Sequence, residues 1–347
     1  MISQKVLRVV LLACIWTLPA ALAAEEPAQA PGPDKALKKD RKETGKKVSE
    51  AAAPLKDPVV TVKNKGKDPR KELRYTPDKG CKSSLAMTLR MEMTTEMGAF
   101  KPPQTKIPAQ ETKFDFEVTS VSPNGDIAYN YRVSDVKIAE GEEGVNPMVS
   151  NAMKTQLEGI KGLSGSAVVT ARGFTKKATV TVPEGASPTV KQMLESMTQS
   201  AQQFSAPLPE EAVGVGAVWT VATTIEQNGM SIDQTTTYEV LGFEGDAVQL
   251  KAVVEQSAKE QEVHPSGVPA GMKVKLISYK GKGEGKTTLQ MAQIVPKAAE
   301  MALESTNQMA VDSGGAAPGT EVTTKVKMRT VLTGSVPSKA GPTKAKE

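Results

Sequence analysis

Methionine thioethers are the side chains whose type and spacing could do chemistry in this chain of 347 residues, which has 15 Met but one His and two Cys. Met87, Met91 and Met93 alternate with polar residues, so they project from one face of an extended strand. Three thioethers on one face could bind Cu(I). Methionine alternating with leucine also makes an adaptable apolar surface. We favour that second interpretation, which predicts no metal and no cofactor.

Complete catalytic sets are missing from the sequence. The single His264 excludes sites that need two imidazoles, and nothing in the sequence places it beside Cys81 or Ser164. Ser164 lies in Gly-Leu-Ser-Gly-Ser, which departs from the nucleophile-elbow pattern by one residue. The paired carboxylates Glu142 and Glu143 fall in a predicted loop. We therefore expect a protein without enzymatic activity.

A glycine-rich stretch from Gly281 to Thr287 has the composition of a phosphate-binding loop. That motif requires glycine where Lys280 stands, and a helix must follow it. Thr287 and Leu289 instead continue an alternation typical of a strand. The stretch is predicted to be a basic, glycine-rich strand.

Residues 1–23 have the features of a signal peptide. Lys5 and Arg8 precede an apolar run that ends in small residues and is too short to span a bilayer. They predict export to the periplasm or the extracellular space, with no transmembrane helix in the mature chain. Cys14 lies in a lipobox-like Leu-Leu-Ala-Cys, so lipid anchoring is an alternative, but we favour ordinary cleavage. Cys81 would then be alone and could form no internal disulfide.

The composition changes again after the signal peptide. Residues 24–72 are rich in Lys, Pro and Ala and predict a disordered tether, and residues 335–347 predict a disordered tail. The formal charge of +5 resides in these tails, because residues 75–334 contain more acidic than basic side chains. The Lys-rich tether predicts weak contact with anionic groups of the envelope. We expect no specific nucleic-acid partner.

Between the tails, alternation with a period of two predicts strands joined by tight turns. Asn124-Gly125 is a typical hairpin turn. The predicted strands cover residues 85–93, 114–121, 127–138, 164–172, 176–183, 217–228, 230–243, 246–257, 273–292 in pieces, 297–310 and 321–333. Asn146-Pro147 and Ser187-Pro188 each predict the start of a short amphipathic helix, because a capping residue precedes a proline there.

Two segments of the core resemble each other. Residues 116–121 resemble 238–243, and a similar spacing relates Gly165 to Gly285. We therefore predict an internal duplication, with residues 73–205 and 206–334 as two similar halves. The predicted fold class is mainly β: antiparallel curved sheets from two similar halves with two short covering helices.

The segment Leu208–Trp219 contains the pattern Pro-x-x-x-Val-Gly-x-Gly-x-x-Trp before a strand. With the signal peptide, the tether and the Met/Thr-rich strands, it resembles a family of uncharacterised exported bacterial proteins, a domain of unknown function. More distantly, the predicted curved antiparallel sheets with one or two covering helices resemble the half-barrels of periplasmic lipoprotein carriers. The resemblance implies a curved antiparallel sheet and brings no activity and no catalytic residues.

Together these features predict a non-enzymatic cell-envelope protein that binds an apolar ligand or lipid in a cavity between sheet and helices. The alternative is an envelope scaffold or surface-interaction protein with a fully packed core. The expected ligand-binding residues are apolar side chains of one predicted strand, one predicted helix and the tryptophan of the pattern above. They are Met87, Leu89, Met91, Met93, Met193, Leu194, Met197 and Trp219.

Overall fold

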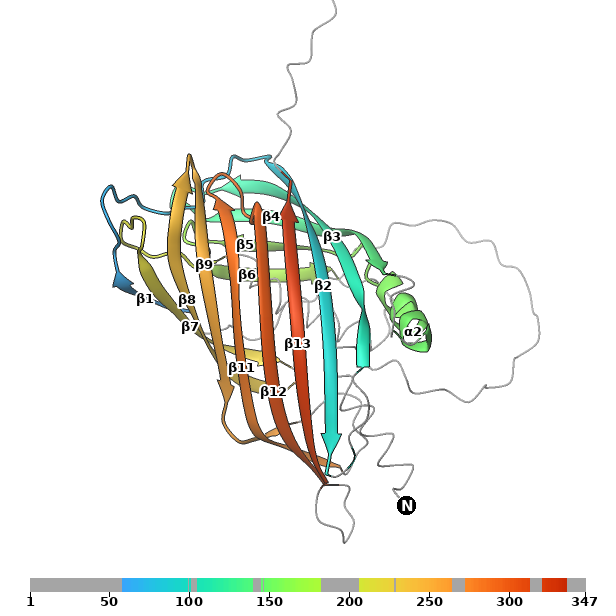
Figure 1. Ribbon diagram of the computed structural model, residues 1–347. Helices are drawn as coiled ribbons and strands as arrows, with labels where there is room; N and C mark the ends of the chain where they lie inside the picture. The colour runs from blue at the N-terminus through green and yellow to red at the C-terminus, as the bar shows by residue number, and fades with distance from the viewer. Residues whose placement is uncertain are drawn as a thin grey trace, which may run out of the picture.

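An antiparallel sheet of 13 strands organises the part of the chain that the structure describes (Figure 1). The structure is a computed structural model and describes residues 58–98, 100, 105–139, 145, 147–181, 206–227, 229–263, 272–312 and 320–335. Its elements are β1 (Val59–Asn64), β2 (Lys82–Met97), β3 (Thr105–Val121), β4 (Ile127–Ile138), α2 (Pro147–Glu158), β5 (Ser164–Val169), β6 (Thr175–Thr181), β7 (Val218–Gln227), β8 (Met230–Glu244), β9 (Ala247–Ala258), β10 (Gln261–Val263), β11 (Lys273–Gln290), β12 (Ala298–Asp312) and β13 (Thr320–Gly334). Across the sheet the strand order is β1-β7-β8-β9-β11-β12-β13-β2-β3-β4-β5-β6, and β10 pairs with β11.

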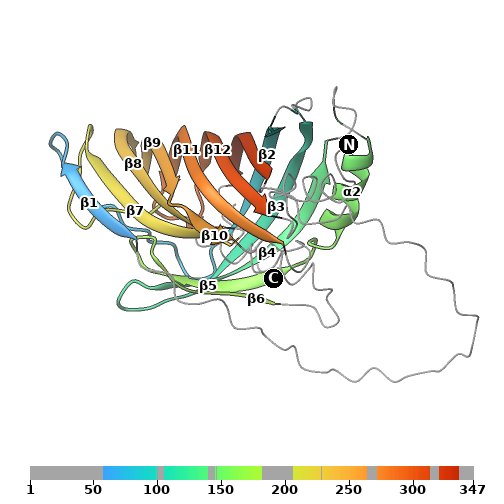
Figure 2. The same cartoon turned by 90° about the horizontal axis from the view of Figure 1, so that it is seen from below.

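The sheet curls over itself. Figure 2 shows the strands from β1 to β2 as a curved row, with β5 and β6 turned back across its hollow side. In Figure 1, strands β5 and β6 cross only one end of the long strands β8, β9 and β11–β13. We call the hollow side the concave face and the opposite side the convex face.

Alternation along each strand decides which side chains reach the concave face, because successive side chains of a strand point to opposite faces. In β9 the even-numbered residues from Val248 to Val254 are buried, and Gln249, Lys251 and Glu255 point to the convex side. Residues that pair across neighbouring strands lie on the same face, for example Leu250 with Thr287 and Ala252 with Gly285. The concave face is therefore the apolar face of most strands.

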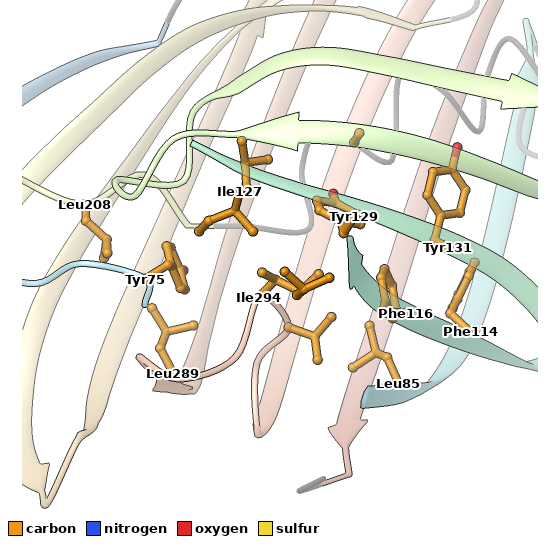
Figure 3. Close-up of a cluster of buried hydrophobic side chains, with 14 of the residues drawn as sticks. Tyr75, Leu85, Phe114, Phe116, Ile127, Tyr129, Tyr131, Leu208, Leu289 and Ile294 are labelled. Atoms are coloured by element: carbon orange, nitrogen blue, oxygen red, sulfur yellow. The ribbon is translucent and has the colours of Figure 1, made fainter. Parts of the chain in front are cut away.

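The largest group of buried side chains, the upper core, lies where the sheet crosses itself (Figure 3). Phe116 of β3 lies near Tyr129 and Tyr131 of β4, with ring centroids 6.0 and 6.5 Å away. Leu289 and Ile294 approach them from the opposite layer. Burial of apolar surface between the two layers stabilises the curl.

A second group, the lower core, lies at the other end of the long strands. It contains Met97, Met230, Ile232, Val263, Val274, Leu276, Tyr279, Met309, Val311 and Val322. Ile232 and Leu276 are fully buried. The concave face thus carries one apolar cluster at each end, and a third, smaller cluster around Met91 and Ile107 lies between them beside Met153 of α2.

Most predicted strands are confirmed, with ends within a few residues of those expected. The glycine-rich stretch from Gly281 to Thr287 is the middle of strand β11, as predicted. The turn at Asn124-Gly125 is confirmed as well, with Gly125 at a φ of 83°. The short strand β10 was not predicted, because three residues are too few to show a period.

The described chain corrects one prediction and does not support another. Residues 59–64, assigned to the tether by composition, form the edge strand β1, which pairs with β7 because Val60 and Val62 pack against the upper core. The predicted duplication is not shown. Strands of both proposed halves share one sheet, and β5 and β6 are less than half as long as β11 and β12, because only β5 and β6 fold back over the core.

The covering helices also differ from the prediction. The structure describes one helix, α2, which begins at the expected Pro147 and contacts β3 and β4. The second predicted helix, at 187–204, lies outside the described residues, as do the predicted signal peptide and Cys14. In the part of the chain described, no helix is long and apolar enough to cross a membrane.

Candidate ligand-binding face

The predicted apolar residues of β2 all point to the concave face. Register places Met91 between Met328 of β13 and Ile107 of β3, in one row across three strands. Leu89 lies opposite Thr330 in the next row, and Met87 opposite Leu332 in the row after that. The alternation in the sequence therefore showed which residues of this strand share one face.

The structure extends this surface over β12 and β13, which the sequence analysis did not connect to β2. Leu303 lies opposite Met328, and Met301 lies opposite Thr330. We define the Met/Leu face as the concave-facing residues Leu89, Met91, Met93, Met301, Leu303, Val326 and Met328. The alternation within each strand was visible in the sequence, but no local pattern shows that β13 pairs with β2.

Several side chains of the Met/Leu face are incompletely covered. Leu89, Met301, Leu303, Val326 and Met328 are only half-buried, although they lie between the buried upper and lower cores. Met91 and Met93, in contrast, are each 8% exposed. An uncharged apolar surface thus remains accessible in the middle of the concave face.

Helix α2 borders this face. Its residue Met153 is buried against Met91 and Ile107, and Val149 and Leu157 of the same helix join that cluster. These helical residues are four positions apart, so they lie on one side of the helix. The helix therefore borders the Met/Leu face at its β3 side.

Two other predicted site residues belong to the upper core and not to the Met/Leu face. Trp219 is fully buried in the upper core, where it stacks on Tyr238 with ring centroids 5.4 Å apart. Its Nε1 donates a hydrogen bond to the carbonyl oxygen of Pro207 at 3.2 Å. Met87 packs against the same core. The predicted residues of the second helix, Met193, Leu194 and Met197, lie outside the described residues.

Three glycines of β11 form a row beside the Met/Leu face. Gly281, Gly283 and Gly285 occupy successive concave-facing positions, opposite Ser305, Leu303 and Met301. A Cβ at Gly283 would lie 2.7 Å from the carbonyl oxygen of Ala302, and one at Gly285 would overlap that of Glu300. Glycine is required here because neighbouring backbone approaches closely. The row leaves the concave face of β11 without side chains beside the Met/Leu face.

Next to this surface, polar side chains form a belt across the concave face. Tyr279 donates a hydrogen bond from its hydroxyl to Gln256 Oε1 at 2.9 Å, and Gln256 Nε2 donates to Gln234 Oε1 at 2.7 Å. Burial raises the pKa of Tyr279, and a hydrogen bond with Ser305 partly opposes that shift. Tyr279 therefore stays protonated, and able to donate, at neutral pH.

The belt continues through Asn307 of β12, Thr324 of β13 and Thr95 of β2, which lie opposite one another. Thr324 and Thr95 are each 6% exposed. Asn307 Oδ1 is buried and accepts no hydrogen bond. We use the name polar belt for Gln234, Gln256, Tyr279, Ser305, Asn307, Thr324 and Thr95.

Charged side chains of the long strands point to the convex face instead. One convex row alternates in sign across six strands through residues that lie directly opposite one another. The row is Glu255, Lys282, Glu304, Lys327, Glu92 and Lys106. A shallow, open depression of about 670 Å³ lies over part of it, next to Asp233 and Lys280. Opposite charges at facing positions stabilise neighbouring strands.

The described residues offer little else for chemistry. They contain no group of three or more His, Cys, Asp or Glu arranged to hold a metal ion. Cys81 is a free thiol just before β2. Burial raises the pKa of this thiol, and the nearby Asp78 carboxylate raises it further, which lowers its reactivity at neutral pH.

The Pro-x-x-x-Val-Gly-x-Gly-x-x-Trp segment has a structural role. It pairs with residues 65–71 through backbone hydrogen bonds from Lys67 to Val215, from Gly214 to Lys65, and in both directions between Lys71 and Val213. We call this paired region the clasp. A Cβ at Gly214 would overlap the carbonyl oxygen of Lys67, which explains the glycine at this position.

Two arginines add hydrogen bonds at the clasp, Arg74 from the chain just after residues 65–71 and Arg172 from the turn between β5 and β6. Arg74 donates from its guanidinium to the carbonyl oxygens of Pro209 at 3.0 Å and Glu210 at 2.7 Å. Arg172 donates to the carbonyl oxygen of Leu208 at 3.0 Å. Together with the buried Trp219, these bonds hold the ends of the curled sheet in place.

Comparisons with known proteins say little about function. None of the curated proteins compared with the chain matches it. Among solved structures, Vibrio cholerae OmpT, an outer membrane protein in trimer form, is 7% identical at a TM-score of 0.18, covering 74% of this chain and 100% of that one. Pseudomonas aeruginosa OccK9 is 5% identical at a TM-score of 0.19, covering 72% and 98%. Such scores support no inference about this chain.

Residues 191–293, which include the Gly214-x-Gly216-x-x-Trp219 part of the clasp, match a family of unknown function, DUF6263.

Proposed function

We propose that this chain is an exported, non-enzymatic protein of the cell envelope that binds an apolar ligand or lipid on its Met/Leu face. One observation carries the proposal. Leu89, Met301, Leu303 and Met328 stay half-buried between two well-buried cores, on a face where the long strands place no charged side chain.

The physical chemistry of these residues suits a ligand of variable shape. Methionine is unbranched and polarizable, so it adapts to different apolar surfaces. Completing the burial of a half-buried Leu or Met side chain contributes on the order of 1 kcal/mol. Several such side chains can therefore supply affinity without any specific polar contact.

The proposed location of the protein, in the cell envelope, is argued from the sequence alone. The signal-peptide features of residues 1–23 support export, and the Lys-rich residues after them support weak contact with anionic groups of the envelope. Mature protein purified from the periplasmic or culture fraction of its host should have lost these first residues. Protein that keeps them and remains in the cytoplasm would contradict this part of the proposal.

Adjacent substitutions on β13 test the binding face. Met328→Gln places an amide on the Met/Leu face, whereas Arg329→Gln makes the same replacement on the convex face of the same strand. Burying an amide without a partner costs about 1–3 kcal/mol. We expect Met328→Gln to weaken binding of Nile red, an uncharged apolar dye, about tenfold or more, and Arg329→Gln to leave it unchanged.

The result can contradict the proposal in two ways. Equal affinities for the two variants would show that the dye binds elsewhere. The unmodified protein could also fail to bind the dye and show no bound lipid by native mass spectrometry after purification from its host. That result would favour the alternative of a scaffold with a fully packed core. Circular dichroism spectra of both variants control for loss of fold.

A further inference from the structure

We infer that the ligand is an uncharged amphiphile, whose apolar chain lies on the Met/Leu face and whose hydrogen-bonding head group lies at the polar belt beside Asn307. The inference rests on the proposed function and names the class of ligand for the same face. Three observations carry it: the adjacency of the two surfaces, an unsatisfied buried acceptor and the distribution of charge.

The polar belt directly adjoins the Met/Leu face. Along β12, Leu303, Ser305 and Asn307 occupy successive concave-facing positions, so the surface changes from apolar to polar over four residues. At about 3.3 Å per residue this distance is about 13 Å. β13 shows the same change, from Met328 to Thr324. A molecule with one apolar and one polar end would match both parts of this surface.

Asn307 supplies the acceptor. Its Oδ1 is buried without a hydrogen bond, and such a group costs about 1–3 kcal/mol when it has no partner. The neighbouring belt residues Tyr279, Gln256 and Gln234 bond to one another instead. A hydroxyl or amide N–H of a ligand would satisfy the oxygen of Asn307. The belt therefore favours a head group that donates a hydrogen bond.

The charge distribution excludes an ionised head group. In β12 the charged residues Glu300, Glu304 and Asp312 all occupy convex-facing positions, and in β13 Lys325 and Arg329 do so. The belt offers uncharged hydroxyl and amide groups in their place. A carboxylate or phosphate there would lose its hydration without gaining a counter-ion, which is strongly unfavourable. The head group that fits is neutral.

Three ligands that share one oleoyl chain test the inference. Monoolein has a neutral head with two hydroxyl donors, methyl oleate has a neutral head without a donor, and oleate at pH 8 is ionised. We expect the full chain to bind monoolein about tenfold more tightly than either of the others, as measured by displacement of Nile red. One hydrogen bond to a buried acceptor is worth about this factor.

Asn307→Leu removes the acceptor, and Gln308→Leu makes the same replacement at the next residue, on the convex face. We expect Asn307→Leu to abolish the preference for monoolein over methyl oleate and Gln308→Leu to retain it. Asn307→Leu should also melt at the same temperature or higher, because it removes an unsatisfied buried group. The melting measurement shows that the variant is folded.

Each outcome decides the question. If Asn307→Leu keeps the monoolein preference, or if oleate binds the unmodified protein most tightly, the head-group inference is wrong while apolar binding on the Met/Leu face stands. If all three oleoyl ligands bind equally, the inference is wrong in the same way. If neither the dye nor any of the three binds, the proposed function itself is refuted, as expected for a concave face filled by the chain's own residues.

Discussion

Substitution of Gly214 by alanine should open the clasp. A Cβ at this position would overlap the carbonyl oxygen of Lys67, an atom of the backbone that cannot move without displacing residues 65–71. That segment is held to residues 213–215 by hydrogen bonds between backbone groups, including those of Lys67 with Val215 and of Gly214 with Lys65. The substitution forces the two segments apart at the centre of this pairing.

The expected cost follows from the bonds that are lost. Each backbone hydrogen bond contributes about 1 kcal/mol net to the free energy of unfolding. Loss of the two bonds next to Gly214 would cost about 2 kcal/mol. If the bonds between Lys71 and Val213 break as well, the cost rises to about 4 kcal/mol. We therefore expect Gly214→Ala to lower the free energy of unfolding by about 2–4 kcal/mol.

Two other glycines serve as controls. Gly242 has open space around its would-be Cβ and no positive φ, so Gly242→Ala should change stability by less than about 0.5 kcal/mol. Gly216 also has open space but a φ of 78°, so Gly216→Ala should cost about 1–2 kcal/mol from backbone strain alone. Urea unfolding followed by tryptophan fluorescence would report all three values.

The order of these costs tests the argument. Gly214→Ala should be the most destabilising variant, and amide hydrogen exchange should show loss of protection at Lys67 and Lys71. A cost for Gly214→Ala no greater than that for Gly242→Ala would refute the close approach of Lys67. Equal costs for Gly214→Ala and Gly216→Ala, with protection retained, would show that strain and not overlap selects glycine in this segment.

Two further predictions concern protonation and charge. Four of the five tyrosines are buried and Tyr238 is half-buried, and loss of hydration raises the pKa of each, to about 12 for Tyr131 and Tyr238. Because these tyrosine pKa values exceed the unfolded value of about 10, the stabilisation that the protonated tyrosines give the fold is complete below pH 10 and is lost as the pH rises towards 12. Tyrosinate absorbance should therefore appear together with unfolding. Titration of the tyrosines near pH 10 in folded protein would contradict this. Lys327→Glu places a third carboxylate between Glu304 and Glu92. It should cost about 1 kcal/mol at low salt and less in 1 M NaCl, measured by urea unfolding, whereas a cost that salt does not reduce would mean that the convex charges do not interact.

Much of the secondary structure could be predicted because its causes are local. The alternation of Leu and Met with polar residues in β2 shows which side chains share a face, whatever the strand pairs with. Asn124-Gly125 identifies a turn because the positive φ of Gly125 is a property of that residue. Residues 59–64 were misassigned because the Lys-rich composition around them outweighed four β-branched residues. What holds this strand in the sheet is its pairing with β7, which lies far away in the sequence.

The candidate site could be predicted only in part. The sequence correctly assigned Met87, Leu89, Met91 and Met93 to one face, but it placed Trp219 beside them, whereas the structure buries that residue in the upper core. The roles of Leu303, Met328 and Asn307 could not be predicted. Each depends on the pairing of β12 with β13 and of β13 with β2.

By itself, then, the sequence determined which segments are strands, where they turn, and which side of each strand is apolar, because period and turn chemistry act within a few residues. Only the tertiary structure decided which strands are neighbours. Lys325 and Glu96, joined by a hydrogen bond of 3.1 Å, are 229 positions apart in the chain. The pairing of β12 with β13 and of β13 with β2 aligns the apolar residues of these strands into one Met/Leu face and places the polar belt beside it. Such long-range register is fixed by the packing of the whole curled sheet, and no local pattern encodes it.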